Sequence, residues 1–163
     1  MIDAQIGHEK TVTGMLTALS GSNMIYGMGM LEMGMTMSYE QLLIDAEIVR
    51  MIRRIMQGIA VNDETLAAEV IRAVGPAGTY LSQKHTMRHM RKESSQTKLI
   101  DRRMIEAWEK DGRKDMFTRA NEEARRILES HKPTPLPEAA AREIRRIIED
   151  AEGELAERKK SQK

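Results

Sequence analysis

The sequence predicts a mainly α-helical chain with one short β-strand, and three observations support this. Apolar residues recur at intervals of three and four along most of the chain, which is the spacing of one helix face. A single β-prone run, Asn23 to Tyr26, is closed by a glycine and is the only good strand candidate. Aromatic residues are only 3% of the chain, so the core must rely on methionine, isoleucine, leucine and alanine.

Composition narrows the class of protein. At 163 residues, 40% hydrophobic and 31% charged, the chain is expected to be one soluble globular domain. Its 26 basic and 25 acidic residues give no net field that would attract nucleic acid or an anionic membrane. The absence of cysteine excludes disulfides and thiolate metal sites. No apolar run reaches the roughly 18 residues of a membrane span, and the N-terminus lacks the apolar region of a secretory signal, so a cytoplasmic location is expected.

The first helix is predicted over residues 3–20, because Asp3 can cap its N-terminus and Gly21 can end it. The strand candidate follows directly. A strand needs hydrogen-bonding neighbours, so either this segment is not a strand or its sheet partners lie outside this chain. Three glycines then interrupt any regular element, and residues 27–37 are predicted to form a loop.

A second, stronger helix is predicted from Ser38 to Gln57. Ser38 and Gln41 have the spacing of a capping box, in which each side chain accepts a hydrogen bond from the other residue's amide. Two acidic residues, Asp45 and Glu47, lie within its apolar stretch. Because an unpaired buried carboxylate is costly, we predict that they form ion pairs with nearby arginines of the same helix, namely Arg50, Arg53 and Arg54.

The rest of the chain is predicted to be a series of shorter helices and one stiff spacer. Glycines and capping residues delimit the helices, at about 62–74, 84–92, 101–111, 116–130 and 137–159. The spacer is KPTPLP, residues 132–137, whose three prolines favour extended structure. The last helix has a narrow apolar stripe, and we expect this stripe to pack on its own domain rather than in a coiled coil.

The methionine-rich stretch NMIYGMGMLEMGMTMSYEQ, residues 23–41, has three interpretations. Its thioethers could bind Cu(I), although no cysteine or nearby histidine supports this. Its methionines could instead fill gaps or form an adaptable partner surface. A glycine-rich loop after a strand, with the single carboxylate Glu32, also fits the rim of an active site. A dinucleotide site is disfavoured, because Glu32 occupies the place of the third glycine in G-x-G-x-x-G.

A basic segment, KHTMRHMRK, begins at Lys84. His85 and His89 have the spacing of the two ligands in zinc hydrolases, but Thr86 stands where those enzymes carry a glutamate base. No third ligand can be nominated from the sequence, so no metal site is predicted. The alternatives are a solvated basic face and an anion site built from Arg88, Arg91 and Lys92.

Seven blocks carry a wider resemblance: IDAQIGHEK, SNMIYGMGMLE, SYEQLLIDAEI, QGIAVNDETLA, KHTMRHMRKES, LIDRRMIEAWE and RILESHKPTPLP. In this order they resemble the C-terminal part of the trimethylamine methyltransferase family. Members move a methyl group from a methylated amine to a cobalt corrinoid carried by a partner protein. Homologues act on other substrates, glycine betaine among them, and the family functions in methanogenesis from methylated amines.

The resemblance implies that the chain is the end of a (β/α)8 TIM barrel. Residues 1–60 would supply the seventh barrel helix, the eighth strand at 23–26 and the eighth helix. Residues 61–163 would form a C-terminal helical extension. The partners of the lone strand would then be the seventh and first strands of the closed barrel.

The resemblance also implies where substrate and partner bind. Active sites of such barrels lie at the C-terminal ends of the strands, which assigns substrate binding to Tyr26, Gly27, Gly29 and Glu32. A docking surface for the corrinoid protein would use Met28, Met30 and Met33. The catalytic residues are expected upstream of this chain, and we expect it to bind no cofactor directly, because the partner carries the corrinoid.

Two alternatives accompany this interpretation. The chain could be a helical interaction module without catalysis, and homo-oligomer formation is left open.

In trimethylamine-specific members, an in-frame amber codon within the barrel encodes pyrrolysine. Reading that codon as a stop leaves a separate downstream frame, and the present sequence is expected to be such a downstream piece or a domain taken from the same region.

Overall fold

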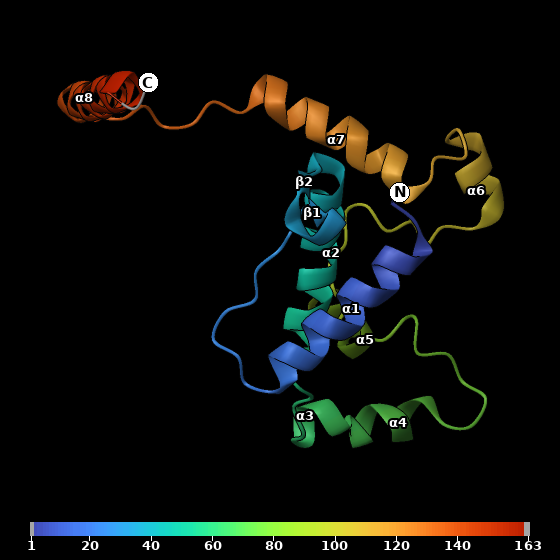
Figure 1. The fold of residues 1–163 in the computed structure, drawn as a ribbon. Coiled ribbons are helices and arrows are strands. Elements are labelled where there is room, and N and C mark those ends of the chain that lie inside the picture. The colour runs from blue at the N-terminus through green and yellow to red at the C-terminus, as the bar shows by residue number, and fades with distance from the viewer. Residues whose placement is uncertain (1, 162–163) are drawn as a thin grey trace. The chain divides into compact units, whose positions relative to one another are not determined.

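The computed structural model describes residues 2–161 and is mainly helical (Figure 1). The chain divides into two compact units, Met1–Glu129 and Ser130–Lys163. The predicted boundary near residue 60, between a barrel and its extension, is a different kind of division and stays a prediction. Within residues 2–161, no helix combines the length and apolar character that crossing a membrane requires.

Helix α1 (Ala4–Leu19) confirms the first predicted helix. The Asp3 carboxylate caps it by accepting hydrogen bonds from the amides of Gln5 and Ile6. Gly21 follows its end with a φ of +82°, the left-handed conformation that glycine adopts without strain. None of the helix's residues is buried, although it carries several large apolar side chains.

The predicted strand at residues 23–26 is absent from this structure. The segment has no regular secondary structure, and its side chains Met24, Ile25 and Tyr26 are 75%, 44% and 81% exposed. The physical reason is that a strand forms only beside another strand. Among the described residues, no strand pairs with this segment.

The prediction of a loop at residues 27–37 is also wrong in part. Strands β1 (Met30–Leu31) and β2 (Thr36–Met37) form a short antiparallel hairpin around the 3-10 turn η1 (Glu32–Gly34). The turn is made by left-handed backbone at Glu32, Met33 and Gly34, with φ values of 51°, 50° and 90°. The glycine that was expected to break regular structure therefore helps to reverse the chain.

Helix α2 (Tyr39–Met56) begins where predicted, but only half of the capping box forms. The Ser38 hydroxyl accepts from the Gln41 amide at 3.1 Å. The Ser38 amide donates to the Gly29 carbonyl at 2.9 Å instead of to Gln41. The Gln41 side chain is thereby left to donate within the helix to Asp45, at 2.6 Å.

Downstream helices follow the predicted order with changed boundaries. Ala67, at a φ of 52°, breaks the predicted 62–74 helix into α3 (Asp63–Leu66) and α4 (Ala68–Val74). The helix predicted at 101–111 starts only at Ile105, and the Asp101 carboxylate before it binds the amide and guanidinium of Arg103. The remaining helices of this unit are α5 (Lys84–Glu93), α6 (Ile105–Lys110) and α7 (Met116–Ser130).

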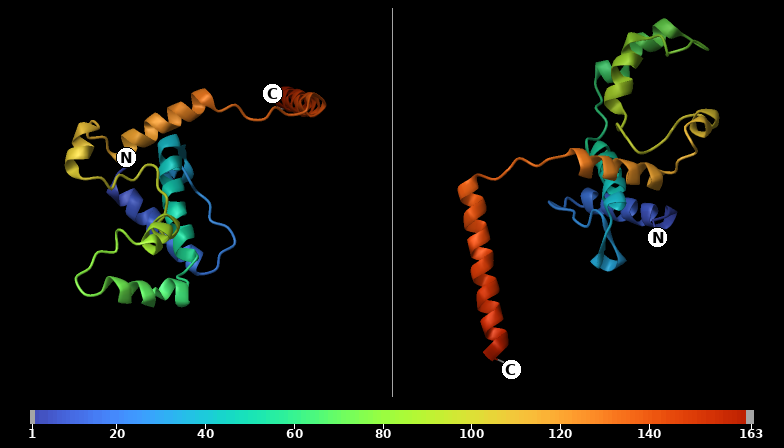
Figure 2. Two further views of the ribbon diagram at one scale, coloured as in Figure 1. Left: turned by 180° about the vertical axis from the view of Figure 1, so that it is seen from behind. Right: turned by 90° about the horizontal axis from the view of Figure 1, so that it is seen from above.

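A small core holds the first unit together. Its buried apolar residues are Ile44 in α2, Leu99 in the segment before α6, and Ala120 in α7. Partly buried apolar side chains surround them. Helices α1 and α2 lie side by side in both views of Figure 2. Helix α2 therefore contacts both the start of the chain and its later helices.

The second unit is helix α8 (Glu138–Ser161), which follows the proline-rich spacer. Arg146 pairs with Glu143 and Asp150 along one helix face. The large side chains of its apolar stripe are about half exposed: Ile144 47%, Ile147 55%, Ile148 52% and Leu155 56%. The expectation that this stripe packs on its own domain stays a prediction.

Candidate functional site

A groove of about 510 Å³ lies between α1, residues 24–28 and α2. Its lining is mostly apolar and includes Met24, Tyr26 and Met28. Pockets of this size and character are suited to small ligands or to an apolar chain segment. The groove is therefore the candidate site on this part of the chain.

Asp45 anchors one wall of the groove. Only 4% of this residue is exposed. Its Oδ2 accepts from the Lys10 ammonium at 2.5 Å and from the Gly29 amide at 2.8 Å, and its Oδ1 accepts from Gln41 at 2.6 Å. The Lys10 ammonium also donates to the Gly27 carbonyl at 3.3 Å. This network ties α1 and the segment before the hairpin to α2.

The ion pairs predicted within α2 are only partly right. Glu47 pairs with Arg50, as predicted. Asp45 pairs instead with Lys10, which lies 35 residues away in the sequence and on another helix. Glu47 is 1% exposed and also accepts from the Lys98 amide with both oxygens, at 3.0 and 3.1 Å. Both buried carboxylates thus hold distant segments against α2.

Gly29 is required by the local fold. It is buried at a φ of +77°, and an added Cβ would lie 2.7 Å from the Met37 Cε atom and 3.0 Å from the Leu42 Cβ atom. A side chain there would clash as well as strain the backbone. Gly27 has a φ of +98° and uses its carbonyl to bind Lys10.

The four residues predicted to bind substrate occupy three places, and Gly29 is the buried one, with its amide donating to Asp45. Tyr26 and Gly27 line the groove, and the Tyr26 side chain is 81% exposed. Glu32 lies on the hairpin turn, outside the groove lining formed by the described residues, and accepts from the Thr36 hydroxyl at 2.9 Å. Their role in substrate binding stays a prediction.

The methionines predicted to bind a partner are likewise divided. Met28 lines the groove and is 37% exposed. Met33 lies at the tip of the hairpin turn and is fully exposed. Met30 is half-buried beneath that turn, in strand β1. A partner could therefore reach Met28 and Met33 more readily than Met30.

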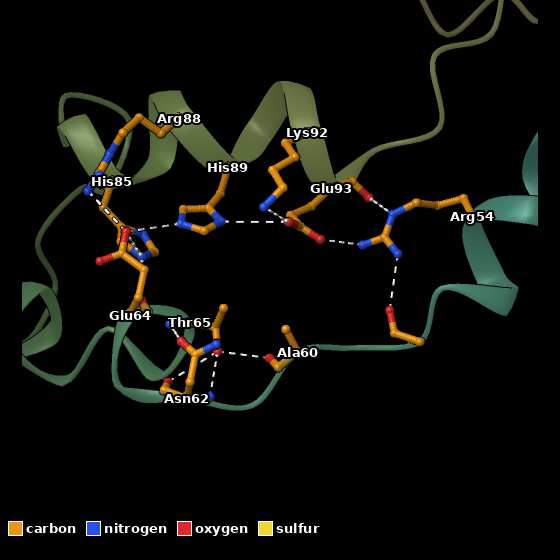
Figure 3. Close-up of polar contacts among 11 residues, drawn as sticks. Arg54, Ala60, Asn62, Glu64, Thr65, His85, Arg88, His89, Lys92 and Glu93 are labelled. Carbon is orange, nitrogen blue, oxygen red and sulfur yellow. Dashed lines mark hydrogen bonds and ion pairs between the residues drawn. The ribbon is translucent and has the colours of Figure 1, made fainter.

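A second polar cluster joins α3 to α5, as Figure 3 shows. His85 Nε2 is 2.7 Å from the Glu64 main-chain oxygen, and His89 Nε2 is 3.4 Å from Glu64 Oε1. The two imidazole rings stack with centroids 4.2 Å apart. Hydrogen bonding to His89 and the charge of Arg88 lower the pKa of the Glu64 carboxyl.

Glu64 is the member of this cluster that the sequence did not reveal. The spacing of His85 and His89 was visible, but Glu64 lies 21 residues before His85 on a separate helix. The only signal in the sequence was that Asn62 could start a helix carrying an acidic first turn. The irregular chain between α4 and α5 then brings this turn under the histidines.

Comparison with known proteins gives one consistent family. The family model for trimethylamine methyltransferase (MTTB) matches residues 1–156. The chain is 54% identical over 152 residues to a trimethylamine methyltransferase of Desulfitobacterium hafniense and 44% identical over 150 residues to one of Methanosarcina barkeri. These matches cover 93% and 92% of this chain, and 30% of each relative.

A relative with another substrate in its name is also similar. A glycine betaine methyltransferase of Desulfitobacterium hafniense is 35% identical over 143 residues, which is 86% of this chain and 30% of that protein. The chain thus spans 30% of the length of these curated relatives, and it matches their C-terminal part.

Proposed function

The chain belongs to the trimethylamine methyltransferase family, and we propose that it is the C-terminal part of an enzyme that moves a methyl group from a methylated amine to the corrinoid of a partner protein. The support is the match of residues 1–156 to the family and the names of the relatives, which cover trimethylamine and glycine betaine. The proposed activity belongs to the longer protein, because the match covers 30% of those relatives.

One structural observation carries this proposal: the apolar side chains around the candidate groove have no cover. Helix α1 buries none of its residues, and Leu16 and Leu19 on it are 60% and 58% exposed. Residues 24–26 add a further exposed apolar run, which no strand of the described residues pairs with. Large exposed apolar surface marks an interface. We infer that the rest of the longer polypeptide packs on these exposed apolar side chains.

The proposed architecture places the rest of the polypeptide against these exposed apolar side chains. In the complete enzyme, α1 acts as the seventh helix of a (β/α)8 barrel and α2 as the eighth. Residues 23–26 become the eighth strand when the seventh and first strands lie beside them. Residues 24–26 form one wall of the groove beside α1 and α2, and the strand takes this place. The Asp45 network holds α1 and α2 in place for it.

Substrate recognition in this proposal uses the groups at the end of that strand. The nitrogen of trimethylamine is cationic when protonated, and that of glycine betaine carries a permanent charge. The Tyr26 ring can attract such a cation through its face, and the Glu32 carboxylate can balance its charge. When its carrier docks, the corrinoid supplies a Co(I) nucleophile that accepts the methyl group, and the amine leaves with the electron pair of the broken C–N bond.

The residues of this chain fit a surface that the corrinoid carrier covers rather than a site that holds the corrinoid. Met28, Met33 and Met35 are exposed at 37%, 103% and 83%. Methionine is polarizable and conformationally adaptable, which suits contact with a large partner. We propose that these side chains contact the corrinoid protein while Tyr26 and Glu32 face the substrate.

Methyl transfer assayed on the parent polypeptide tests this function. Purified parent enzyme, reduced corrinoid protein and either trimethylamine or glycine betaine are mixed, and the demethylated amine and the corrinoid absorbance are followed. We expect turnover of one of these substrates by the parent and none by residues 1–163 alone. A parent that demethylates no methylated amine would overturn the proposal in favour of a non-catalytic interaction module.

Tyr26 offers a sharper test within the same assay. We expect Tyr26→Ala in the parent enzyme to raise KM by about 10-fold, the effect of losing one cation–π contact. Tyr80→Ala is the matched control, since Tyr80 is 41% exposed in an irregular segment away from the groove lining. Equal KM values for the two variants would remove Tyr26 from the substrate site.

A further inference from the structure

The cluster between α3 and α5 has a ligand set that methyl transfer does not use. One carboxylate and two imidazoles, from Glu64, His85 and His89, place one ligand atom each within 4.8 Å of one another. Figure 3 shows the Glu64 carboxylate beside both histidine side chains. Imidazole and carboxylate together are ligands that zinc prefers.

We propose that Glu64, His85 and His89 bind one zinc ion that joins α3 to α5. Two histidine nitrogens and one glutamate oxygen are the three protein ligands of a common zinc arrangement, with water in the fourth position. The sequence alone predicted no metal site, because it offered only the two histidines. The fold supplies the third ligand from an element 21 residues upstream.

The geometry is close to what binding requires. The Nε2 atoms of His85 and His89 lie 4.0 and 3.4 Å from the same oxygen, Glu64 Oε1. Ligand atoms that share a tetrahedral zinc at about 2.0–2.1 Å are a little over 3 Å apart. Closing the site requires the His85 and His89 rings, which stack in this structure with centroids 4.2 Å apart, to turn until both Nε2 atoms face the metal. In binding, His85 Nε2 exchanges its contact with the Glu64 carbonyl for the metal.

A further carboxylate orients one of the ligands. His89 Nδ1 lies 3.8 Å from Glu93 Oε1, and Glu93 is held by Arg54 of α2. In zinc sites the second nitrogen of a ligating histidine faces such a carboxylate, which fixes the ring and leaves the other nitrogen for the metal. The line from Arg54 through Glu93 to His89 in Figure 3 has this arrangement.

Arg88 is the group that opposes a cation here. Its guanidinium lies 3.1 Å from Glu64 Oε1 and competes for the carboxylate. The Arg88 side chain is 66% exposed, so it can turn into solvent when zinc binds. Because Arg88 competes with the metal for Glu64, removing Arg88 should raise the affinity for zinc. If these residues do not bind zinc, removing Arg88 should leave the affinity unchanged.

Calorimetric titration of the full chain with Zn²⁺ tests the proposal. We expect one equivalent bound per chain. His85→Ala and His89→Ala should each weaken binding by more than about 100-fold, because outer partners of zinc ligands alone are worth about 10- to 100-fold. Glu93→Gln should weaken it by about 10-fold, and Arg88→Ala should strengthen it. His8→Ala, on α1, is the matched control and should bind as the unmodified chain does.

Two readouts keep the test independent of folding and of methyl transfer. Circular dichroism establishes that each variant keeps its helix content. Co²⁺ in place of zinc should give the visible absorption of a four-coordinate site in the unmodified chain and lose it in His85→Ala. Absence of a stoichiometric Zn²⁺ site in the unmodified chain, or unchanged binding in a folded His85→Ala and His89→Ala double variant, would overturn the proposal.

Discussion

Helices α2 and α8 are both long and amphipathic, yet their surroundings differ. Helix α2 has 18 residues and buries five of them, of which Gln41, Asp45 and Glu47 are polar. Helix α8 has 24 residues, and its apolar stripe is about half exposed. The comparison teaches that helical periodicity identifies the apolar face of a helix. Which segment packs against that face depends on residues distant in the sequence, and the periodicity does not reveal it.

Different interactions stabilise the two helices. Helix α2 depends on tertiary contacts, including amides of Gly29 and Lys98 that donate to its buried carboxylates. Helix α8 has exposed local pairs such as Glu143–Arg146–Asp150, which contribute little because solvent screens them. Substitutions in α2 should therefore change the stability of the whole first unit, and those in α8 should act only on that helix.

Removing the Asp45 carboxylate should have the largest effect. Asp45→Ala leaves the Lys10 ammonium and the Gly29 amide without their acceptor, and breaking a buried pair in this way costs about 3 kcal/mol. Urea unfolding followed by fluorescence of Trp108, which lies in the first unit, measures this loss.

The matched control for that change is Asp150→Ala in α8. Asp150 is exposed, and among the described residues it pairs with Arg146 at 3.0 Å, so its loss should leave the unfolding free energy almost unchanged. Equal urea midpoints for the two alanine variants would contradict the difference drawn between the helices.

Gly29→Ala should have the next largest effect. The left-handed backbone and the close approach of Met37 and Leu42 give an added Cβ no space, and we expect a loss of about 2 kcal/mol. The same Trp108 fluorescence measures it. A variant as stable as the unmodified chain would show that the hairpin is not packed against α2.

Gly153→Ala in α8 should have the opposite sign. An added Cβ there meets no neighbouring atom, and replacing a mid-helix glycine by alanine gains about 0.5–1 kcal/mol of helix stability. Hydrogen exchange of α8 amides should slow, while the Trp108 transition stays in place. A shift of that transition would mean that α8 shares its stability with the first unit.

Acid should act on Glu40 with a smaller effect. Hydrogen bonds from Ser38, from its own amide and from Asn121 of α7 lower the pKa of Glu40 below its ordinary 4.5 in the folded chain. The stability that these bonds contribute is therefore fully present above pH 4.5 and is lost as the pH falls through the lowered pKa.

Glu40→Gln removes this dependence and tests its sign. Between pH 7 and pH 3, the unfolding free energy followed by Trp108 should fall less steeply in Glu40→Gln than in the unmodified chain. Glu143→Gln is the control: Arg146 lowers the pKa of Glu143, but that pair is exposed on α8. A slope altered as much by the Glu143 variant would contradict the account.

Local signals in the sequence predicted much of the helical architecture. Asp3 caps α1 as expected, and Ser38 caps α2 although only half of its predicted capping box forms. Such caps depend on residues within three positions, as does the cap of α3 by Asn62. The break at Ala67 was not predicted, since nothing in that residue type favours left-handed backbone. Helix existence could thus be predicted more reliably than helix boundaries.

Contacts between segments distant in the sequence could not be predicted from it. The Lys10–Asp45 pair and the approach of Glu64 to the histidines join different helices, and no local pattern encodes them. The strand at residues 23–26 shows the same limitation in reverse. Its β-prone composition was visible, but without a neighbouring strand among the described residues it stays irregular.

Hydrogen exchange at residues 24–28 tests most directly whether this region belongs to a larger enzyme. In residues 1–163 alone, none of these amides donates a backbone hydrogen bond to another described residue, so they should exchange at nearly the free rate. In the parent polypeptide, a barrel strand at 23–26 should slow the exchange of its amides by more than about 100-fold. Equally fast exchange of these amides in both proteins would contradict the account.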